Sequence, residues 1–398
     1  MVKAAISHWP RKPGPILDWL IGDARKSPDG ASLLRSLCTR LVDAGLHLAR
    51  ASFHLRILHP QLFGMGFYWT RGIDEIRVFE AQHGIQETEL YRSSPMRALF
   101  EGADRVRQRL DLSDAQLELP LFHELKAEGL TEYVALPMVF SDGKIHGTTW
   151  ATDRSGGFED AHLAEIEDLL PIFSLLLESH LNRLITVGLL NTYVGPHAGE
   201  RILEGQITRG SGETVHAAIW LCDLRGFTAM SERQNRDQLI TSLNEYFDHM
   251  APAVERHGGE ILKFIGDAML ALFPLDTDGA CERALKAAIE ARAAMMECNE
   301  ERQRRGEGAL EFGIALHTGD VMYGNIGSAN RLDFTIIGPA VNLTSRMEGL
   351  CRSLGPSILM SDTFADLCAD HFTLRSLGTH RLTDIARPVE LFTVDWMS

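Results

Sequence analysis

The first half of the chain mixes apolar positions at helical spacing with apolar positions at strand spacing. Leucines recur three and four residues apart over residues 33–48, which predicts a helix. Phe53, Leu55 and Ile57 alternate with polar or small residues, which predicts a strand. Further strands are predicted over residues 64–69, 76–79, 133–140 and 144–151, and a short helix is predicted to begin after Ser94-Pro95.

The order of these elements indicates a domain type. The last two strands flank Ser141-Asp142-Gly143, which is typical of a hairpin because glycine accepts the positive φ of such a turn. A long helix from about Phe158 follows. Helix, antiparallel strands, short helices, hairpin and long helix in this order resemble a GAF-type sensor domain of α/β fold. We therefore expect residues 1–158 to form a GAF-like sensor that receives an unknown small-molecule or protein signal.

Three residues of this half have side chains that can bind metals or react. His54 and His59 are either ligands of a metal or haem, or hydrogen-bonded structural residues. Cys38 is either a redox reporter or a small buried hydrophobe. The sequence favours the structural reading for all three, because each stands alone in its segment.

Residues 159–210 are expected to form a helical linker that includes the closing helix of the sensor. Pro171 interrupts the pattern and predicts a bend or a later start of the helix. The spacing predicts a two-stranded coiled coil between two chains, with a single amphipathic helix packed on its own domain as the alternative. The apolar positions of the predicted seam are Leu163, Ile166, Leu170, Phe173, Leu177, Leu184 and Val187.

A second domain is expected over residues 211–398, after a glycine-rich join at residues 210–213. A nearly continuous apolar run, residues 215–222, predicts a buried strand. The segments after it predict a helix over 239–254, a hairpin of 260–264 with 268–273, a helix over 280–304, and strands over 310–317 and 320–324. This β-α-β-β-α-β order is that of a ferredoxin-like fold of the α+β class.

Two carboxylates stand where strands of this domain end. Asp223 follows the buried strand, and Asp267 lies in the turn of the hairpin. Mg²⁺ prefers oxygen ligands and binds through one or two carboxylates together with phosphate oxygens. Gly226, beside the first carboxylate, leaves backbone N–H groups accessible to a phosphate. The pattern indicates an enzyme that acts on a nucleoside triphosphate.

Composition narrows the class of protein. A length of 398 residues favours two domains, and a net charge of −15 disfavours a nucleic-acid or anionic-membrane surface. The six cysteines are scattered, without a CxxC pair, as in a reduced cytosolic protein. Residues 9–13 lack the apolar stretch of a secretion signal, and the apolar run 169–177 is too short to span a membrane. We therefore expect a cytoplasmic location and no membrane span.

Four strings in this domain occur together and in order. They are residues 223–228 (Asp-Leu-Arg-Gly-Phe-Thr), 263–267 (Lys-Phe-Ile-Gly-Asp), 317–320 (His-Thr-Gly-Asp) and 334–348, which contains Gly-Pro-Ala-Val-Asn-Leu-Thr-Ser-Arg-Met-Glu. Together they resemble the class III adenylate/guanylate cyclase catalytic domain. The resemblance implies conversion of ATP to 3′,5′-cyclic AMP and pyrophosphate in a homodimer. A guanylate cyclase and a catalytically silent cyclase-like dimerisation module are the alternatives.

The resemblance implies roles for the residues around the first two strings. Asp223 and Asp267, with the backbone of Leu224, would bind two Mg²⁺ ions per site, and Mn²⁺ is able to substitute. One ion would activate the ribose 3′-hydroxyl, and the other would neutralise the departing pyrophosphate. The loop residues Gly226, Phe227 and Thr228 would present backbone N–H groups to the phosphates.

The resemblance also implies how the base and the ribose are recognised. Lys263 would donate to adenine N1, and the Thr335 hydroxyl would accept from the N6 amine. Many members of the family have Asp at the Thr335 position, but a subgroup of adenylate cyclases has Thr. Asn342 would orient the ribose, and Arg346 would stabilise charge on the α-phosphate. In the family the carboxylates come from one chain, and these four residues from the other.

One string departs from the family. The family usually has a Leu-Lys-Gly string near its end, whose Lys binds the terminal phosphates. Here the matching residues are Leu382-Thr383-Asp384, so Thr383 stands where the cation is expected. Arg381 and Arg387 are the candidate replacements, and the sequence does not choose between them.

Overall fold

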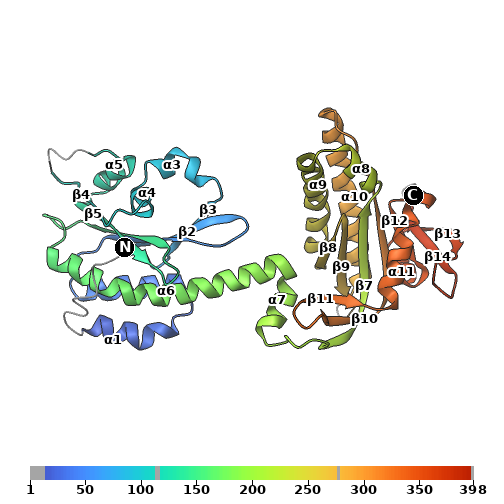
Figure 1. Cartoon of the computed structure of the whole chain (residues 1–398), viewed down its shortest axis with the longest axis horizontal. Helices are drawn as coiled ribbons and strands as arrows, with labels where there is room; N and C mark the ends of the chain where they lie inside the picture. Colours follow the sequence, from blue (N-terminus) through green and yellow to red (C-terminus); the bar gives the residue numbers. More distant parts are fainter. Residues whose placement is uncertain (1–13, 113–116, 276–277, 396–398) are drawn as a thin grey trace. The chain divides into compact units, whose positions relative to one another are not determined.

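The computed structural model describes residues 14–112, 117–275 and 278–395 and contains two compact units, Met1–Leu189 and Leu190–Ser398. Figure 1 shows the elements of both units along the chain. Residues 9–13, on which the expectation about a secretion signal rests, lie outside the described residues. Within the described ranges, no helix combines the length and the apolar character that a membrane span needs.

The N-terminal unit is built on a six-stranded antiparallel sheet in the order β3-β2-β1-β6-β5-β4. Its strands are β1 (Arg50–Arg56), β2 (Leu62–Thr70), β3 (Arg77–Gln82), β4 (Val106–Arg109), β5 (Glu132–Val139) and β6 (Ile145–Thr152). Its helices are α1 (Pro15–Ile21), η1 (Asp23–Lys26), α2 (Gly30–Asp43), η2 (Ile85–Glu87), α3 (Glu89–Arg92), α4 (Pro95–Phe100), α5 (Pro120–Ala127) and α6 (Asp160–Val194).

The two faces of this sheet differ because successive side chains of a strand point to opposite sides. Phe53 and Leu55 of β1 join the main core with residues of α2 and α6, and the ring of Phe53 stacks on that of Phe173 with centroids 4.9 Å apart. A second cluster packs α4 and α5 against the other face, around Leu99 and Phe122. The sheet is therefore covered on both sides by helices of its own unit.

Most elements predicted in this unit are present. The hairpin of β5 and β6 forms with Gly143 at φ 77°, and Ser94 caps α4 by accepting a hydrogen bond from the Met96 amide at 3.2 Å. The first predicted helix was too long, because α2 ends at Asp43 and Leu48 is buried in the segment that leads into β1. The element order agrees with the expected one, and the GAF assignment itself stays a prediction.

The predicted coiled-coil seam is wrong for its first five positions. Helix α6 runs unbroken through Pro171, but Leu163, Ile166, Leu170, Phe173 and Leu177 are all buried in the core of their own unit. A residue that packs on its own sheet is not available to a second chain. For these positions the alternative prediction, an amphipathic helix packed on its own domain, matches the structure. The later positions, Leu184 and Val187, lie outside that core and are not buried.

The C-terminal unit has the predicted ferredoxin-like core. Strands β10, β7, β9 and β8 are neighbours in that order and antiparallel, and β12, β14, β13 and β11 extend the sheet. Its strands are β7 (Gly212–Leu224), β8 (Glu260–Ile265), β9 (Ala268–Pro274), β10 (Phe312–Gly327), β11 (Leu332–Ile337), β12 (Ile358–Ser361), β13 (Leu374–His380) and β14 (Val389–Val394). Its helices are α7 (Pro196–Leu203), α8 (Phe227–Arg233), α9 (Arg236–Arg256), α10 (Ala280–Arg304), α11 (Pro339–Glu348), α12 (Cys351–Leu354) and α13 (Asp362–Asp366).

Alternation along β7 determines what covers each face of this sheet. Trp220 and Cys222 point toward α9 and α10, which lie together on one face (Figure 1). Ile219 and Leu221 point to the other face, where Ala340 of α11 joins their cluster. Asp223 continues the second series, so strand periodicity places its side chain on the α11 side of the sheet.

Two expectations about this unit need correction. The strands predicted over 310–317 and 320–324 are one continuous strand, β10, whose pairing with β7 runs without a break from Phe312 to Gly324. The join at residues 210–213 is not a free connection. The Gly210 amide donates to the Asn325 carbonyl at 2.9 Å, the Asn325 amide donates to the Ser211 carbonyl at 2.8 Å, and β7 already begins at Gly212.

Candidate functional site

Asp223 and Asp267 lie close together at one edge of the C-terminal sheet. Asp223 is the next-to-last residue of β7, and Asp267 lies in the turn between β8 and β9, the strand that pairs with β7. The two side chains are close enough for Asp267 to raise the pKa of Asp223, and Asp223 accepts a hydrogen bond from the Leu224 amide at 2.9 Å. Strand pairing has thus brought together two carboxylates that are far apart in sequence.

The electrostatics of this pair favour a cation. Burial and the neighbouring Asp267 and Glu348 raise the pKa of Asp223 from 3.8 to about 7. A carboxyl group whose ionised form is disfavoured by its neighbours recovers that cost when a positive charge binds beside it. The oxygen donors of this pair therefore fit Mg²⁺ or Mn²⁺, which take carboxylate ligands.

A third carboxylate, that of Glu348, lies beside the pair. Glu348 ends α11, and its Oε1 lies 2.6 Å from where a Cβ would stand on Gly313, the residue opposite Asp223 in the β7–β10 ladder. Burial raises the pKa of Glu348, the charge of Arg225 lowers it, and that of Asp267 raises it. Glycine at position 313 is what leaves room for this carboxylate above the strand.

The loop after Asp223 leads directly into a helix. Gly226 has φ 76° and precedes α8, and a Cβ placed on it would meet open space. Glycine is therefore required here by the backbone conformation rather than by packing within the chain. Phe227 packs partly against the core, whereas Thr228 is exposed. The first amides of a helix have no acceptor within it, so Phe227 and Thr228 retain free N–H groups.

Lys263 and Thr335 belong to neighbouring elements. The Lys263 ammonium binds the Asp333 carboxylate of β11 at 3.2 Å, and Asp333 is more than half exposed. Thr335 is only 4% exposed, and its Oγ1 is buried without a hydrogen-bond partner among the described residues. Leaving a buried hydroxyl unpaired costs about 1–3 kcal/mol, so this oxygen is prepared to bond a ligand.

Helix α11 separates its residues into two faces. Thr344 and Met347 are buried against the sheet, and Glu348 lies over Gly313. Asn342 and Arg346 are one helical turn apart and exposed on the outer side. Arg346 and Glu348 are two residues apart, which corresponds to a rotation of about 200° around the helix at 3.6 residues per turn. Arg346 therefore points away from the side on which Glu348 lies near the carboxylates.

Arg346 forms an ion pair with a residue of the string that departs from the family, residues 382–384. Its guanidinium binds the Asp384 carboxylate at 3.0 Å, and Asp384 has φ 64°, the positive φ that the glycine of the family string would adopt without strain. Thr383 is exposed, and so are Arg381 and Arg387, neither of which forms an ion pair with a described residue. The match of residues 382–384 to the family string is thus supported by backbone conformation.

Sequence reasoning missed some residues of this site. The sequence predicts no role for Glu348, although its charge acts on the carboxylate pair. Asp333 and Asp384, which hold the two cations, carried no signal because their importance lies in contacts across 70 and 38 residues of sequence. Glu348 carried no local signal either, because the register that places Gly313 opposite Asp223 exists only in the folded sheet.

The buried histidine of the third string is a structural residue. His317 donates or accepts a hydrogen bond with the Ser361 hydroxyl at 2.8 Å, and burial lowers its pKa to about 4. Asp320, at the end of the same string, is bonded to His216 at 2.8 Å on the exposed surface. This string therefore fixes the path of β10 rather than adding a side chain to the site.

Comparison with known proteins assigns this unit to a family. Residues 211–390 match the model of the adenylate and guanylate cyclase catalytic domain. An adenylate cyclase of Anabaena cylindrica is 38% identical over 172 residues, which is 42% of this chain and 34% of that protein. Adenylate cyclase 1 of Rhizobium meliloti is 29% identical over 174 residues, 43% of this chain and 26% of that protein. The chain thus spans about a third or less of the length of these relatives.

Two solved structures each match a little under half of the chain. The guanylyl cyclase Cya2 is 33% identical, with a TM-score of 0.41, over 46% of this chain and 93% of its own. The adenylyl cyclase CyaB from P. aeruginosa is 30% identical, with a TM-score of 0.42, over 46% of this chain and 96% of its own.

Proposed function

Residues 211–390 of this chain belong to the adenylate and guanylate cyclase catalytic domain family, and we propose that the protein is an adenylate cyclase that converts ATP to 3′,5′-cyclic AMP and pyrophosphate. The observation that carries the proposal is the Asp223–Asp267 pair, two crowded carboxylates at adjoining strand ends in a unit of this family. The relatives from Anabaena cylindrica and Rhizobium meliloti, both named adenylate cyclases, support the same reaction.

The carboxylate pair would hold Mg²⁺, or Mn²⁺ in its place, with the Leu224 backbone beside it. When bound, the metal supplies Lewis-acid stabilisation of the triphosphate and a lowered pKa of the attacking 3′-hydroxyl. The protein contributes the site itself: Asp223 is fixed by the Leu224 amide, and the N–H groups of Phe227 and Thr228, at the start of α8 after Gly226, would bind the phosphates.

The preference for adenine rests on Lys263 and Thr335. Lys263 is positioned by Asp333 and can donate to adenine N1, while the unpaired Thr335 hydroxyl can accept from the N6 amine. A hydroxyl can also donate, so Thr335 discriminates less sharply than a carboxylate would. Guanylate cyclase is the second candidate function, and a guanine would require the opposite donor and acceptor pattern at these positions.

The outward direction of Asn342 and Arg346 supports a site made by two chains. Both residues lie on the exposed side of α11, away from the side that faces the carboxylates of the same chain. In a homodimer, Arg346 of one chain would instead stabilise the α-phosphate held by the carboxylates of the other, and Asn342 would orient the ribose. Arginine suits this role because its planar guanidinium gives two parallel hydrogen bonds to phosphate oxygens.

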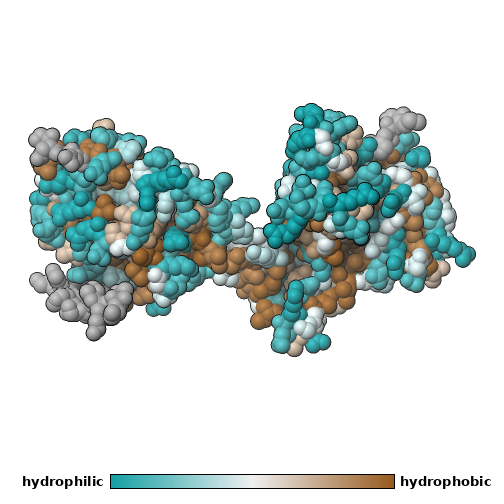
Figure 2. Space-filling model, turned by 45° about the horizontal axis from the view of Figure 1, so that its top comes forward, coloured by the Kyte–Doolittle hydropathy of each residue, from teal (hydrophilic) through white to brown (hydrophobic). Residues whose placement is uncertain are grey.

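Exposed apolar side chains near the base-binding residues support the same arrangement. Phe264, Ile265 and Ile337 are 50%, 52% and 47% exposed, and they are neighbours in sequence of Lys263 and Thr335. Figure 2 shows apolar side chains on the surface of this unit. A large apolar group on the surface is typical of a contact with another protein, and a second copy of this unit would cover these residues.

We propose that the N-terminal unit regulates the cyclase. It has a core of its own, and its last helix, α6, continues as far as Val194, past Leu190 where the catalytic unit begins. A helix shared in this way is a common route by which a change in one domain alters the next.

One assay separates the candidate functions. The purified full-length protein is incubated with ATP or GTP and with Mg²⁺ or Mn²⁺, and cyclic nucleotide is quantified. We expect cyclic AMP to exceed cyclic GMP, and Asp223→Ala to abolish product. Asp248→Ala is the matched control, because it removes an exposed carboxylate of α9. A preference for GTP would indicate a guanylate cyclase, and no product under any condition would indicate a silent dimerisation module.

A further inference from the structure

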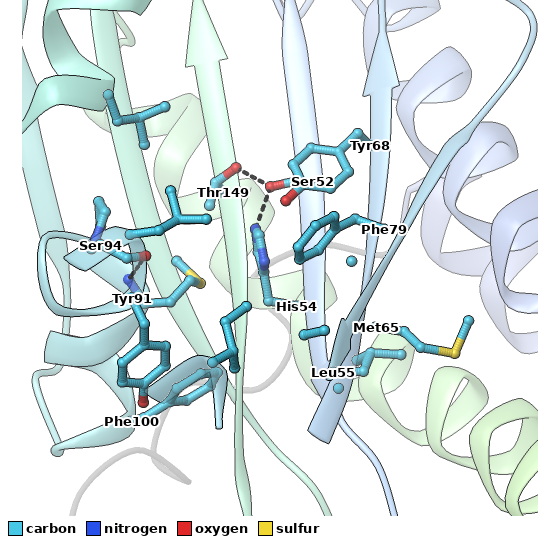
Figure 3. Close-up of a pocket in the computed structure, with 18 of the residues that line it drawn as sticks. Ser52, His54, Leu55, Met65, Tyr68, Phe79, Tyr91, Ser94, Phe100 and Thr149 are labelled. Carbon is cyan, nitrogen blue, oxygen red and sulfur yellow. Dashed lines mark hydrogen bonds between the residues drawn. The ribbon is translucent and has the colours of Figure 1, made fainter. Parts of the chain in front are cut away.

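The N-terminal unit contains a cavity of about 390 Å³ on the side of its sheet opposite α2 and α6. Strands β1, β2, β3 and β6 form its floor, and residues 85–100 and 120–125 form its walls (Figure 3). Protein interiors are close-packed and rarely contain voids of this size, whereas binding pockets for small molecules typically measure about 300–1,000 Å³.

The floor of the cavity alternates polar side chains with glycines. The residues of β1 that point into it are polar, with His54 between Ser52 and Arg56. Their neighbours on the adjoining strands are small: His54 is opposite Gly66 of β2 and Gly147 of β6. The glycines make room for wall side chains to close over the sheet: the Tyr68 ring would lie 2.9 Å from a Cβ on Gly66, and Sδ of Met96 would lie 2.5 Å from one on Gly147.

The centre of the floor is polar but uncharged. The Ser52 hydroxyl is 2.5 Å from the Thr149 hydroxyl and 2.9 Å from Nε2 of His54, as Figure 3 shows. Burial lowers the pKa of His54 to about 4, so the imidazole is neutral at pH 7. These three groups offer hydrogen-bond donors and acceptors to a ligand without adding charge.

Positive charge comes from arginines. The Arg56 guanidinium lies 5.6 Å from the ring centroid of Phe63 and 5.7 Å from that of Phe100, and that of Arg77 lies 4.8 Å from the ring of Tyr68. Neither arginine forms an ion pair with a residue that the structure describes. Among the described lining residues the one acid is Glu124, which is exposed, and Arg50 is the arginine already paired, with Glu128.

Aromatic side chains complete the walls. Tyr68 and Phe79 stand on one side of His54, and Tyr91 and Phe100 lie together on the other (Figure 3). Faces of aromatic rings favour flat apolar partners. No cluster of three acidic, histidine or cysteine side chains suited to a metal occurs among the described residues, which disfavours an inorganic cation as the occupant.

We propose that this cavity binds a small organic anion with a flat aromatic body and a carboxylate or phosphate group. The body would lie between the aromatic walls, and the Ser52–His54–Thr149 group would bond its polar edge. Arg56 would bind the anionic group, and Arg77, which the strand register places level with Ser52, would line another part of the cavity. Both guanidiniums already rest on rings, which holds them in place and reduces the entropy lost when an anion binds.

The first test compares two fluorescent probes that differ by one group. The probe 1-anilinonaphthalene-8-sulfonate has two aromatic ring systems and an anionic sulfonate, and N-phenyl-1-naphthylamine has the same rings without it. Titrated against the full-length protein, the anionic probe should saturate at one molecule per chain and bind about tenfold or more tightly than the neutral one, as expected for a charge-assisted hydrogen bond. Equal affinities, or no saturable binding, would overturn the proposal.

Two variants test whether the probe binds in this cavity. Arg56→Gln should weaken the anionic probe about tenfold to hundredfold and leave the neutral probe unchanged. Arg35→Gln is the matched control, since it removes the same charge from the exposed side of α2, which packs on the opposite face of the sheet. Circular dichroism confirms that each variant is folded. Equal effects of the two variants, or none from Arg56→Gln, would overturn the assignment.

Competition distinguishes the two kinds of anion. Displacement of the bound anionic probe by 1-naphthyl phosphate, by 1-naphthoate or by both supports the site, and the stronger competitor identifies the preferred group. Neutral 1-naphthol, with the same ring system, should compete at least about tenfold less well. Equal competition by the neutral compound would show that the cavity selects only apolar bodies, and the proposal would fail.

Discussion

The substitution Asp223→Asn tests the reasoning about the carboxylate pair without relying on activity. In the wild-type protein, burial and the neighbouring Asp267 and Glu348 disfavour the ionised form of Asp223. Asparagine keeps the shape and the Oδ1 that accepts from the Leu224 amide. Its NH₂ group can also donate to Asp267, so the repulsion between the two carboxylates when both are ionised is replaced by a hydrogen bond. The metal-free protein should therefore gain stability while it loses activity.

The size and the pH dependence of the gain in stability follow from the raised pKa of Asp223. A rise from 3.8 to about 7 corresponds to about 4 kcal/mol at 1.36 kcal/mol per unit, and solvent screening of a half-buried group reduces this to about 1–2 kcal/mol. Because the folded state holds the proton more tightly than the unfolded state, this stability is present below pH 4 and is lost as the pH rises to about 7. Asp223→Asn should therefore be stabilising at pH 8 and roughly a third as stabilising at pH 5, where the folded carboxyl is still protonated but the unfolded one is largely ionised.

Scanning calorimetry of the full-length protein in EDTA at both pH values measures this difference. At pH 8 the transition of the C-terminal unit should rise by about 2–8 °C, given the usual 2–4 °C per kcal/mol for a unit of this size. Asp248→Asn, which removes an exposed carboxylate from the same unit, should leave that transition nearly unchanged. A destabilised Asp223→Asn protein, or the same gain at pH 5 and pH 8, would show that the two carboxylates are not in repulsive contact.

Three further predictions concern catalysis. Asp223→Ala and Arg346→Ala should each be inactive alone, and a mixture should recover up to about a quarter of wild-type activity, because half of randomly paired dimers are mixed and each has one intact site; no recovery despite subunit exchange would exclude a site shared between chains. The double variant Lys263→Glu with Thr335→Cys should lower the ratio of cyclic AMP to cyclic GMP formed and reduce total turnover, because buried groups are left unpaired; an unchanged ratio would place base recognition elsewhere. Glu348→Gln should raise the Mg²⁺ concentration for half-maximal activity about fivefold, the effect of about 1 kcal/mol from one lost neighbouring charge, with turnover at saturating Mg²⁺ little changed; an unaltered Mg²⁺ requirement would separate Glu348 from the metal site.

The ferredoxin-like core of the C-terminal unit was readable from the sequence because its signals are local. The apolar run before Asp223 specifies a buried strand, and the hairpin around Asp267 has a glycine at φ 65° in its turn. Helix α10 has the predicted bounds, since residues at helical spacing report on their own helix alone. The carboxylates that end these elements could be identified in the same way.

Contacts between distant segments were decided by the tertiary structure. The spacing of Phe173 and Leu177 in α6 fits a second chain as well as it fits the chain's own sheet, and only the packing on β1 and α2 chooses between them. Likewise, Glu348 approaches the carboxylate pair because the register of β10 places Gly313 opposite Asp223. The periodicity of a helix records which side is buried but does not record what buries it.

The same distinction applies to the cavity of the N-terminal unit. Alternation in β1 fixes from the sequence that His54 and Arg56 share one face of a strand. Whether that face is solvated, packed or hollow depends on what stands opposite, and Gly66 and Gly147 are brought beside His54 only by the pairing of β1 with β2 and β6. Side-chain periodicity is a local property of the chain, whereas empty space is created jointly by segments that meet only when the chain has folded.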